Sequence, residues 1–135
     1  MKKNKAAAEI WLRKAKDHLI FARAGWKGSK IISDTCVLCQ QAAEKALKAL
    51  LELENIDVEK TLALKTHRLA DIIGECKKYY PQTEHFTDDC DRLTVYYFDR
   101  YPADISLNLT EEDAKFALNT AEKIIKFVEG IISSA

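Results

Sequence analysis

Residues 36–53 read CVLCQQAAEKALKALLEL, and this stretch decides the fold class. Its apolar and small residues recur at alternating steps of three and four, which is the period of one face of an α-helix. Alanine, leucine, glutamate and lysine dominate the stretch, and all four have strong helix propensity. The apolar seam consists of Cys36, Cys39, Ala43, Ala46, Leu50 and Leu53. We therefore predict a long amphipathic helix over about residues 30–54, whose small residues let a neighbouring helix approach closely.

Four more stretches show the same period. We predict helices over about residues 5–25, 67–79 and 83–99, and a fifth that begins at Thr110. The first and last seams consist of Ala8, Leu12, Ala15, Leu19, Ala22 and Trp26, and of Ala114, Leu118, Ala121, Ile125, Val128 and Ile132. No segment alternates in the way that a strand does. The sequence thus predicts an all-α fold, an antiparallel up-and-down helical bundle of four to five helices, in one domain over residues 1–135.

Turn and capping residues predict where these helices begin and end. Gly25 and Gly28 are expected to close the first helix, because glycine tolerates the left-handed backbone at a helix end. Thr66 is expected to cap the third helix, which Pro81 then stops. Thr110 is followed by three acidic residues, which is typical of a capped helix N-terminus.

The composition excludes several classes of protein. The 135 residues include only 4 Gly and 2 Pro, too few for a sandwich or barrel with many turns. The 21 basic and 21 acidic residues balance, so there is no global positive field for nucleic acid. Residues 1–30, however, hold nine basic residues against Glu9 and Asp17, either as a solvated face or as a patch for phosphate or an acidic partner. No apolar run resembles a signal peptide or membrane span, so we expect a cytoplasmic protein with no membrane partner.

The four cysteines, at positions 36, 39, 76 and 90, could in principle supply thiolates to zinc. Cys36, Cys39 and Cys90 fall on predicted seams, where a small thiol packs as a core residue. We therefore expect reduced core thiols, no metal site and no cofactor.

Two of the three histidines invite a functional interpretation. Arg13 and His18 have the spacing of an Arg-x4-His ribonuclease motif, but five residues separate them by about 140° around a helix, which favours an ordinary amphipathic face. His67 follows Lys65 at a predicted helix N-terminus. It could help to cap that helix, or it could contact a phosphate together with Lys65 and backbone N–H groups.

Residues 92–102, RLTVYYFDRYP, are the most distinctive stretch. Arg100 is four residues after Tyr96 and three after Tyr97, so the three side chains are expected to be neighbours on one helix. Arg100 also lies near the seam, and a half-buried guanidinium needs an acceptor. That acceptor is either a carboxylate such as Glu44 or a ligand phosphate, with the tyrosines available for base stacking.

Four blocks, WLRKAKDHLIFA (11–22), QQAAEKALKAL (40–50), KTHRL (65–69) and YFDRYP (97–102), occur in the order seen in HEPN domain proteins, and nearly the whole chain resembles that family. The resemblance implies an all-α bundle, a homodimer, and pairing with a minimal nucleotidyltransferase in a two-gene module. Arg100, Tyr101 and Pro102 carry over by position, and more weakly Tyr97, Lys65 and His67. Some members are metal-independent ribonucleases that use an Arg-x4-6-His motif, but no histidine stands at that spacing after Arg92 or Arg100.

Three functional hypotheses follow. The first is a non-catalytic HEPN module that binds a nucleotide, a nucleotidyltransferase partner or both, in a toxin–antitoxin-like or stress system. The second is a metal-independent ribonuclease with an altered site, in which Arg92, Tyr97 and Arg100 act on RNA across a dimer cleft. The third is a structural dimerisation domain in which Arg100 neutralises a buried acid. Because the motif histidine is absent, we expect no catalytic residues, and Tyr96, Tyr97, Arg100, Tyr101, Lys65 and His67 are the candidate nucleotide- or phosphate-binding residues.

Overall fold

A computed structural model describes residues 2–98 and 108–135 of the chain, and every ordered element in these residues is helical. Three helices are long: α1 (Lys5–Ser29), α2 (Ile32–Leu53) and α5 (Glu111–Ser133). Between α2 and α5 lie the 3₁₀ turn η1 (Leu62–Leu64), α3 (Leu69–Cys76), the 3₁₀ turn η2 (Pro81–Phe86) and α4 (Thr87–Phe98). The predicted all-α fold is therefore confirmed.

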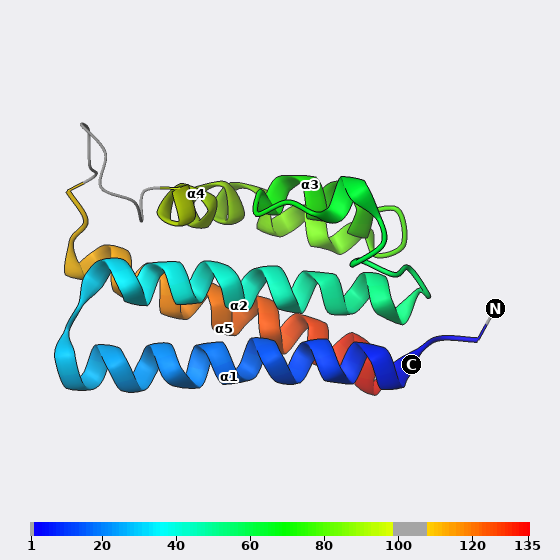
Figure 1. Cartoon of the computed structure of the whole chain (residues 1–135), viewed down its shortest axis with the longest axis horizontal. Coiled ribbons are helices and arrows are strands. Elements are labelled where there is room, and N and C mark those ends of the chain that lie inside the picture. The colour runs from blue at the N-terminus through cyan, green and yellow to red at the C-terminus, as the bar shows by residue number, and fades with distance from the viewer. Residues whose placement is uncertain (1, 99–107) are drawn as a thin grey trace.

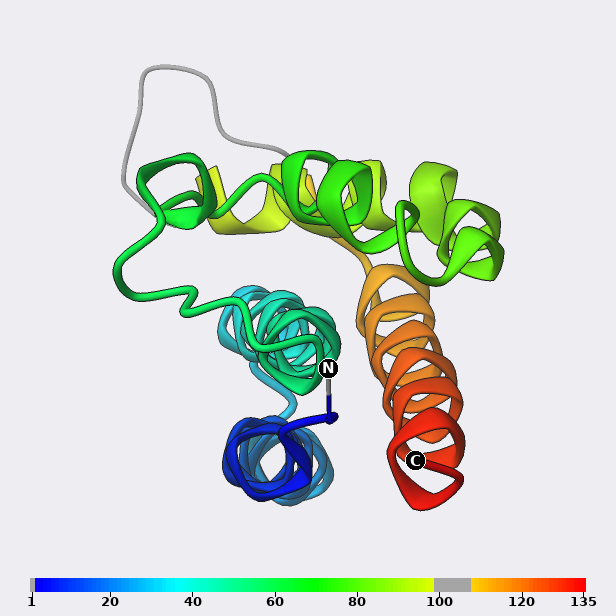
Figure 2. The ribbon, with the colours of Figure 1, turned by 90° about the vertical axis from the view of Figure 1, so that its right-hand side faces the viewer.

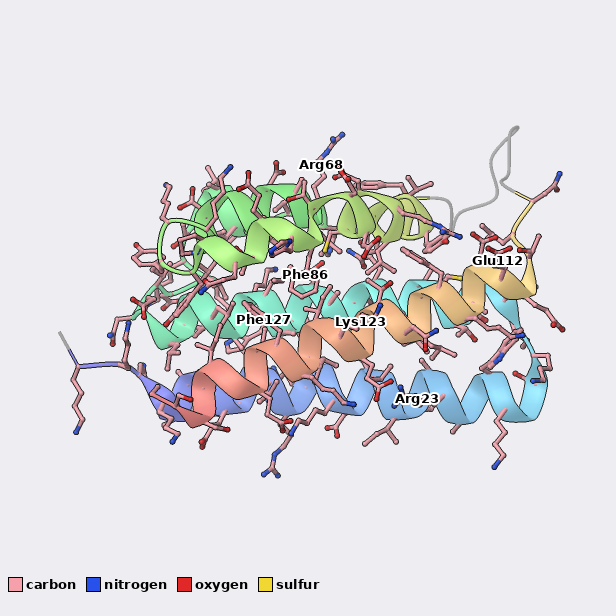
Figure 3. The ribbon with its side chains drawn as sticks, turned by 180° about the vertical axis from the view of Figure 1, so that it is seen from behind. Arg23, Arg68, Phe86, Glu112, Lys123 and Phe127 are labelled. Atoms are coloured by element: carbon pink, nitrogen blue, oxygen red, sulfur yellow. The ribbon has the colours of Figure 1, made fainter. Side chains whose placement is uncertain are left out.

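Helix α1 runs antiparallel to both α2 and α5, whereas α2 and α5 run in the same direction, and the shorter elements add a layer to these three helices (Figure 1). Figures 1 and 2 show α1 and α2 side by side, α5 beside both of them, and α3 with α4 lying along α2 on the side away from α1. Two ion pairs, Lys16–Glu129 and Arg23–Glu122, fix α5 antiparallel to α1, because the residue number rises along one helix as it falls along the other. Phe86 of η2 packs edge-to-face on Phe127 of α5, at 5.3 Å between ring centroids, and so joins the two layers (Figure 3).

The predicted seams form the core. All six seam residues of each long helix are buried. Alanines make up much of the buried faces of α1 and α2, so the two helix backbones can pack closely. Each fully buried leucine stabilises the fold by about 1.5–3 kcal/mol relative to an exposed one. The core therefore positions α2 centrally, with α1, α5 and the α3–α4 layer packed around it.

The end of α1 differs from the prediction. Gly25 and Gly28 are both helical, and the left-handed residue is Lys30, with φ 58°. Its backbone N–H donates to the carbonyl of Trp26, and its ammonium group lies 4.7 Å from the centroid of the Trp26 ring. Trp26 belongs to the buried seam, so packing carries the helix past the glycines to Ser29.

The prediction for Thr66 was also wrong. Helix α3 begins at Leu69, and the N-cap residue is Arg68. The Thr66 hydroxyl accepts a hydrogen bond from the Arg68 N–H at 3.0 Å, so it shapes the extended approach to the helix and does not cap it. At α5 the prediction is confirmed: Thr110 is the N-cap residue, and its N–H donates to the Asp113 carboxylate at 2.8 Å. Pro81 does follow α3, but it starts η2, which occupies residues predicted as part of the fourth helix.

Among the described residues, no helix combines the length and the apolar character needed to cross a membrane.

Candidate functional site

Helix α2 carries three polar side chains on one buried face. Gln40, Glu44 and Lys48 are spaced four residues apart, and they are 0 %, 2 % and 8 % exposed. They come from the block QQAAEKALKAL, whose alanines and leucines pull this part of the helix into the core. Burying a charge without a partner is very costly, so this face requires compensating groups.

Glu44 is the centre of these polar contacts. One carboxylate oxygen, Oε2, accepts a hydrogen bond from Lys48 Nζ at 3.0 Å. The other oxygen, Oε1, lies 2.9 Å from His67 Nδ1. Lys45 Nζ lies 4.0 Å from Oε2 as a weaker third partner. Charge-assisted hydrogen bonds of this kind are stronger than neutral ones, and together they compensate the buried carboxylate.

His67 reaches this carboxylate from the extended segment before α3. Its own carbonyl accepts a hydrogen bond from Gln40 Nε2 at 2.8 Å, which ties the backbone of that segment to α2. Its ring stacks on Tyr97 of α4, with centroids 4.1 Å apart and an interplanar angle of 25°. The side chain remains 49 % exposed, so solvent reaches the imidazole even though a buried carboxylate orients it. We call Gln40, Glu44, Lys48, His67 and Tyr97 the Glu44 cluster.

The surface beside the Glu44 cluster is aromatic and cationic. Phe98 is 56 % exposed and packs edge-to-face on Tyr97, at 5.3 Å between centroids. The guanidinium of Arg68 lies 5.9 Å from the Phe98 ring, and Figure 3 shows this side chain extending outward from the α3–α4 layer. Phe98 and Arg68 come from different elements, so the fold brings an exposed ring and a cation to the same edge of the stacked pair.

A second cationic surface flanks Glu44 on the side of α1. The ammonium groups of Lys14 and Lys45 lie 5.4 and 5.3 Å from the centroid of the Trp11 ring. Burial lowers the pKa of Lys45. Burial, followed by the charge of Lys45, also lowers the pKa of His18, which favours its neutral form. The charged groups near Glu44 are thus mainly cations, with half-buried aromatic carbon beside them.

The structure brings together only part of the predicted set of site residues. His67 and Tyr97 are in contact, and Lys65 is exposed two residues before His67. Arg100 and Tyr101 lie outside the described residues. Glu44, which we considered as a partner for Arg100, is held by Lys48 and His67.

Tyr96 belongs to a different contact. Its phenol donates to Asp113 at 2.7 Å and accepts from Arg92 Nε at 3.0 Å, on the side of α4 that faces α5. Arg92 also pairs with Asp113 at 2.9 Å, and its guanidinium lies 3.8 Å from the Phe116 ring centroid. Within one chain, Tyr96 therefore contacts Arg92 and Asp113, whereas Tyr97 contacts His67. Arg100, the third residue of the grouping predicted from spacing, lies outside the described residues.

The remaining sequence candidates are placed by the bundle. Arg13 lines a recess between α1 and α5, whereas His18 is half-buried near α2, so the two do not act together. All four cysteines are buried, and burial raises the pKa of each thiol to about 12. A thiol with a raised pKa is a poor nucleophile at neutral pH, because the thiolate is the reactive form.

Spacing alone could have identified one part of the site. Glu44 and Lys48 stand at i and i+4, the order that favours a helical ion pair. The contact of Glu44 with His67 joins residues 23 apart in the sequence, and it depends on how the connection after α2 folds back.

The fold and this cluster define an all-α helical-bundle domain in which a buried carboxylate orients a half-exposed histidine against a tyrosine ring. The family model described as the HEPN domain matches residues 8–131, and the chain belongs to that family. The resemblance seen in the sequence blocks is thereby confirmed.

Two solved structures are similar over almost their whole length. The crystal structure of TT1696 from Thermus thermophilus is 27 % identical, with a TM-score of 0.74, and the match covers 96 % of this chain and 98 % of that one. The crystal structure of ST0689, described as an archaeal HEPN homologue, is 26 % identical, with a TM-score of 0.71, and the match covers 98 % and 99 % of the two chains. No curated protein matches the chain.

Proposed function

We propose that this HEPN protein is a non-catalytic binding module that takes a nucleotide at the Glu44 cluster. The observation that carries the proposal is the ring of His67, which is half-exposed, oriented by Glu44 and stacked on Tyr97. A ring held in this way offers a stacking surface without losing side-chain freedom on binding. Preorganisation of this kind raises affinity by lowering the entropy cost of association.

The neighbouring groups fit the two chemical parts of a nucleotide. Bases stack on aromatic and guanidinium planes, and the His67–Tyr97 pair, Phe98 and Arg68 supply both. Phosphates prefer arginine and lysine, and Arg68 is exposed next to Phe98 while Lys65 is exposed two residues before His67. The chain has no net charge, so we expect the attraction to come from this local surface alone.

Calorimetric titration with AMP, ATP and a short single-stranded RNA tests the proposal. The informative variant is His67→Gln, because glutamine can still donate a hydrogen bond to Glu44 but has no ring to stack. We expect it to weaken binding by tenfold or more, since stacking contributes about 1–3 kcal/mol per base. The matched control is His85→Ala, which removes an exposed imidazole from η2. If none of the three probes binds the wild-type protein, the proposal is wrong.

A second candidate function is cleavage of RNA with His67 as the general base. The contact of His67 Nδ1 with the Glu44 carboxylate favours it, because a carboxylate partner fixes the tautomer and the orientation of a histidine. Incubation of RNA with the metal-free protein distinguishes the two candidates. Cleavage that disappears in His67→Gln and persists in His85→Ala would favour the ribonuclease, whereas binding without cleavage favours the module.

The nucleotidyltransferase partner and the toxin–antitoxin-like or stress role rest on the family resemblance alone. Co-purification with a nucleotidyltransferase encoded in the neighbouring gene tests the partner. Co-expression and growth measurements then test the role.

A further inference from the structure

The structure describes all three histidines of the chain, and among the described residues only His67 is bonded to a carboxylate. Its Nδ1 atom lies 2.9 Å from Glu44 Oε1. His18 is half-buried against α2 and His85 is exposed on η2, and neither forms an ion pair or a hydrogen bond with an acidic side chain in the described part of the chain. A carboxylate on one nitrogen is how proteins orient a histidine that reacts through its other nitrogen.

The contact with Glu44 determines which nitrogen of His67 carries the proton. Glu44 is paired with the ammonium group of Lys48 at 3.0 Å, and an ionised carboxylate can only accept hydrogen bonds. Nδ1 of His67 must therefore donate. In the neutral imidazole the other nitrogen, Nε2, then has no hydrogen and carries the lone pair. The cluster thus holds the imidazole in the tautomer in which Nε2 is the nucleophilic atom.

Three contacts hold the ring in one orientation. Glu44 holds its Nδ1 edge, the Tyr97 ring covers one face with centroids 4.1 Å apart, and Gln40 Nε2 donates to the His67 carbonyl at 2.8 Å. The two nitrogens of an imidazole point to different sides of the ring, so Nε2 is directed away from Glu44. The described residues give Nε2 no hydrogen-bond partner, and the side chain is 49 % exposed. An electrophile therefore does not have to displace a described hydrogen-bond partner to reach Nε2.

The segment around His67 favours an electrophile that carries negative charge. Residues 65–70 read KTHRLA and include no acidic residue. Arg68 directly follows His67 and Lys65 stands two residues before it, and both are exposed. Guanidinium and ammonium groups are the side chains that bind phosphoryl oxygens and neutralise the charge that a phosphoryl group carries during transfer. A phosphoryl group is therefore the electrophile that this segment suits best.

We propose that Nε2 of His67 accepts the γ-phosphoryl group of a nucleoside triphosphate, which makes His67 a phosphorylation site. The inference rests on the proposed function, because the nucleotide bound at the Glu44 cluster supplies the phosphoryl group. The lone pair of Nε2 forms a bond to the γ-phosphorus, the bond from that phosphorus to the β–γ bridging oxygen breaks, and the nucleoside diphosphate leaves with its electrons. No proton has to leave Nε2, and the proton on Nδ1 remains hydrogen-bonded to Glu44. Each chain accepts one phosphoryl group, so the step does not require turnover.

Incubation with excess ATP and Mg²⁺, followed by intact-mass spectrometry at alkaline pH, tests the proposal, because a phosphoryl group on nitrogen survives alkali and is lost in acid. Pyruvate kinase and phosphoenolpyruvate remove the ADP, since the phosphoryl group could otherwise return to it. We expect one phosphoryl group per chain, and phosphorus-31 NMR should assign it to Nε2. His67→Gln should lose the modification completely. His85→Ala is the matched control, and it should be modified as fully as the wild type.

Calorimetric titration of the wild type with an ATP analogue whose β–γ bridge cannot be cleaved separates the two ways of failing. If the analogue binds but ATP transfers no phosphoryl group, the phosphorylation site is overturned and the binding module stands. If neither ATP nor the analogue binds, the proposed function is wrong and the phosphorylation site is overturned with it. A phosphoryl group found on Nδ1, or on another residue, also overturns the proposal, because Glu44 would then not direct the reaction to Nε2.

Discussion

Glu44→Gln is the substitution that tests the central cluster most directly. It keeps the size of the side chain and removes its charge, so Lys48 keeps a hydrogen-bond acceptor but loses its counter-ion. The side chains of Glu44 and Lys48 are 3 % and 10 % exposed, so solvent screens this pair very little. Breaking a buried ion pair by removing one member costs about 3–5 kcal/mol. The long stem of Lys48 can extend toward water, so we expect a loss of about 2–4 kcal/mol in the free energy of unfolding.

The partner substitution should cost less. Lys48→Met removes the buried ammonium, but the Glu44 carboxylate keeps its contact with His67. We expect this variant to lose about 1–2 kcal/mol in the free energy of unfolding. The double variant Glu44→Gln/Lys48→Met should lose about 1–3 kcal/mol less than the losses of the two single variants added together. The order of the two single variants follows from the number of partners, since Glu44 has more of them than Lys48.

Urea denaturation followed by circular dichroism measures these free energies. Lys78→Met is the control, because the Lys78–Glu75 pair has a similar length but lies at the surface, and removing it should change stability by less than about 0.5 kcal/mol. A Glu44→Gln protein within about 1 kcal/mol of the wild type would refute the argument that this carboxylate compensates buried charge.

Three further predictions concern other parts of the bundle. Burial of Asp113 opposes its ionisation, but hydrogen bonds from the Thr110 backbone, Tyr96 and Arg92 hold the pKa of its carboxyl well below the usual range. The stability that this carboxylate provides is therefore present above the unfolded pKa of about 3.9 and is lost as the pH falls toward the folded pKa. Asp113→Asn should be less stable than the wild type at pH 7, and its free energy of unfolding should fall less steeply in acid. A variant whose stability depends on acid in the same way as the wild type would contradict this. Tyr96→Phe should lose about 1–2 kcal/mol in urea, because the hydrogen bond to Asp113 disappears, whereas Tyr79→Phe at an exposed ring should not. Burial raises the pKa of all four cysteine thiols to about 12, so at pH 8 a thiol reagent should label them only upon unfolding; rapid labelling of the native protein would show that the thiols are accessible.

The long helices could be predicted from the sequence because their seams repeat over many turns. Each seam residue predicted for α1, α2 and α5 is buried. An apolar stripe that runs the length of a helix is removed from water only when it packs against other helices. The errors lie at the ends of helices. Gly28 does not end α1, because Trp26 packs into the core, and Thr66 does not cap α3, because its hydroxyl shapes the turn before the helix. Local preferences of this size are overridden by tertiary contacts.

The candidate site was less predictable, because it joins segments that are far apart in the sequence. Spacing on one helix suggested that Tyr96 and Tyr97 act together, yet neighbouring residues of a helix point about 100° apart. Tyr97 consequently contacts His67, and Tyr96 contacts Asp113. His67, which contacts Tyr97, comes from a segment with no regular secondary structure. The periodicity of the sequence does not predict the path of such a segment.

The two adjacent tyrosines of α4 contact different parts of the molecule, because Tyr97 packs on His67 before α3 and Tyr96 bonds to Asp113 at the start of α5. A ligand that moves the backbone of α4 at Tyr97 would also move Tyr96, because the two residues are adjacent in one helical turn. That shift would loosen the bond to Asp113, whose carboxylate also holds the first turn of α5. Occupancy beside His67 would then be communicated to the start of the last helix, and hydrogen exchange at Thr110 would report it.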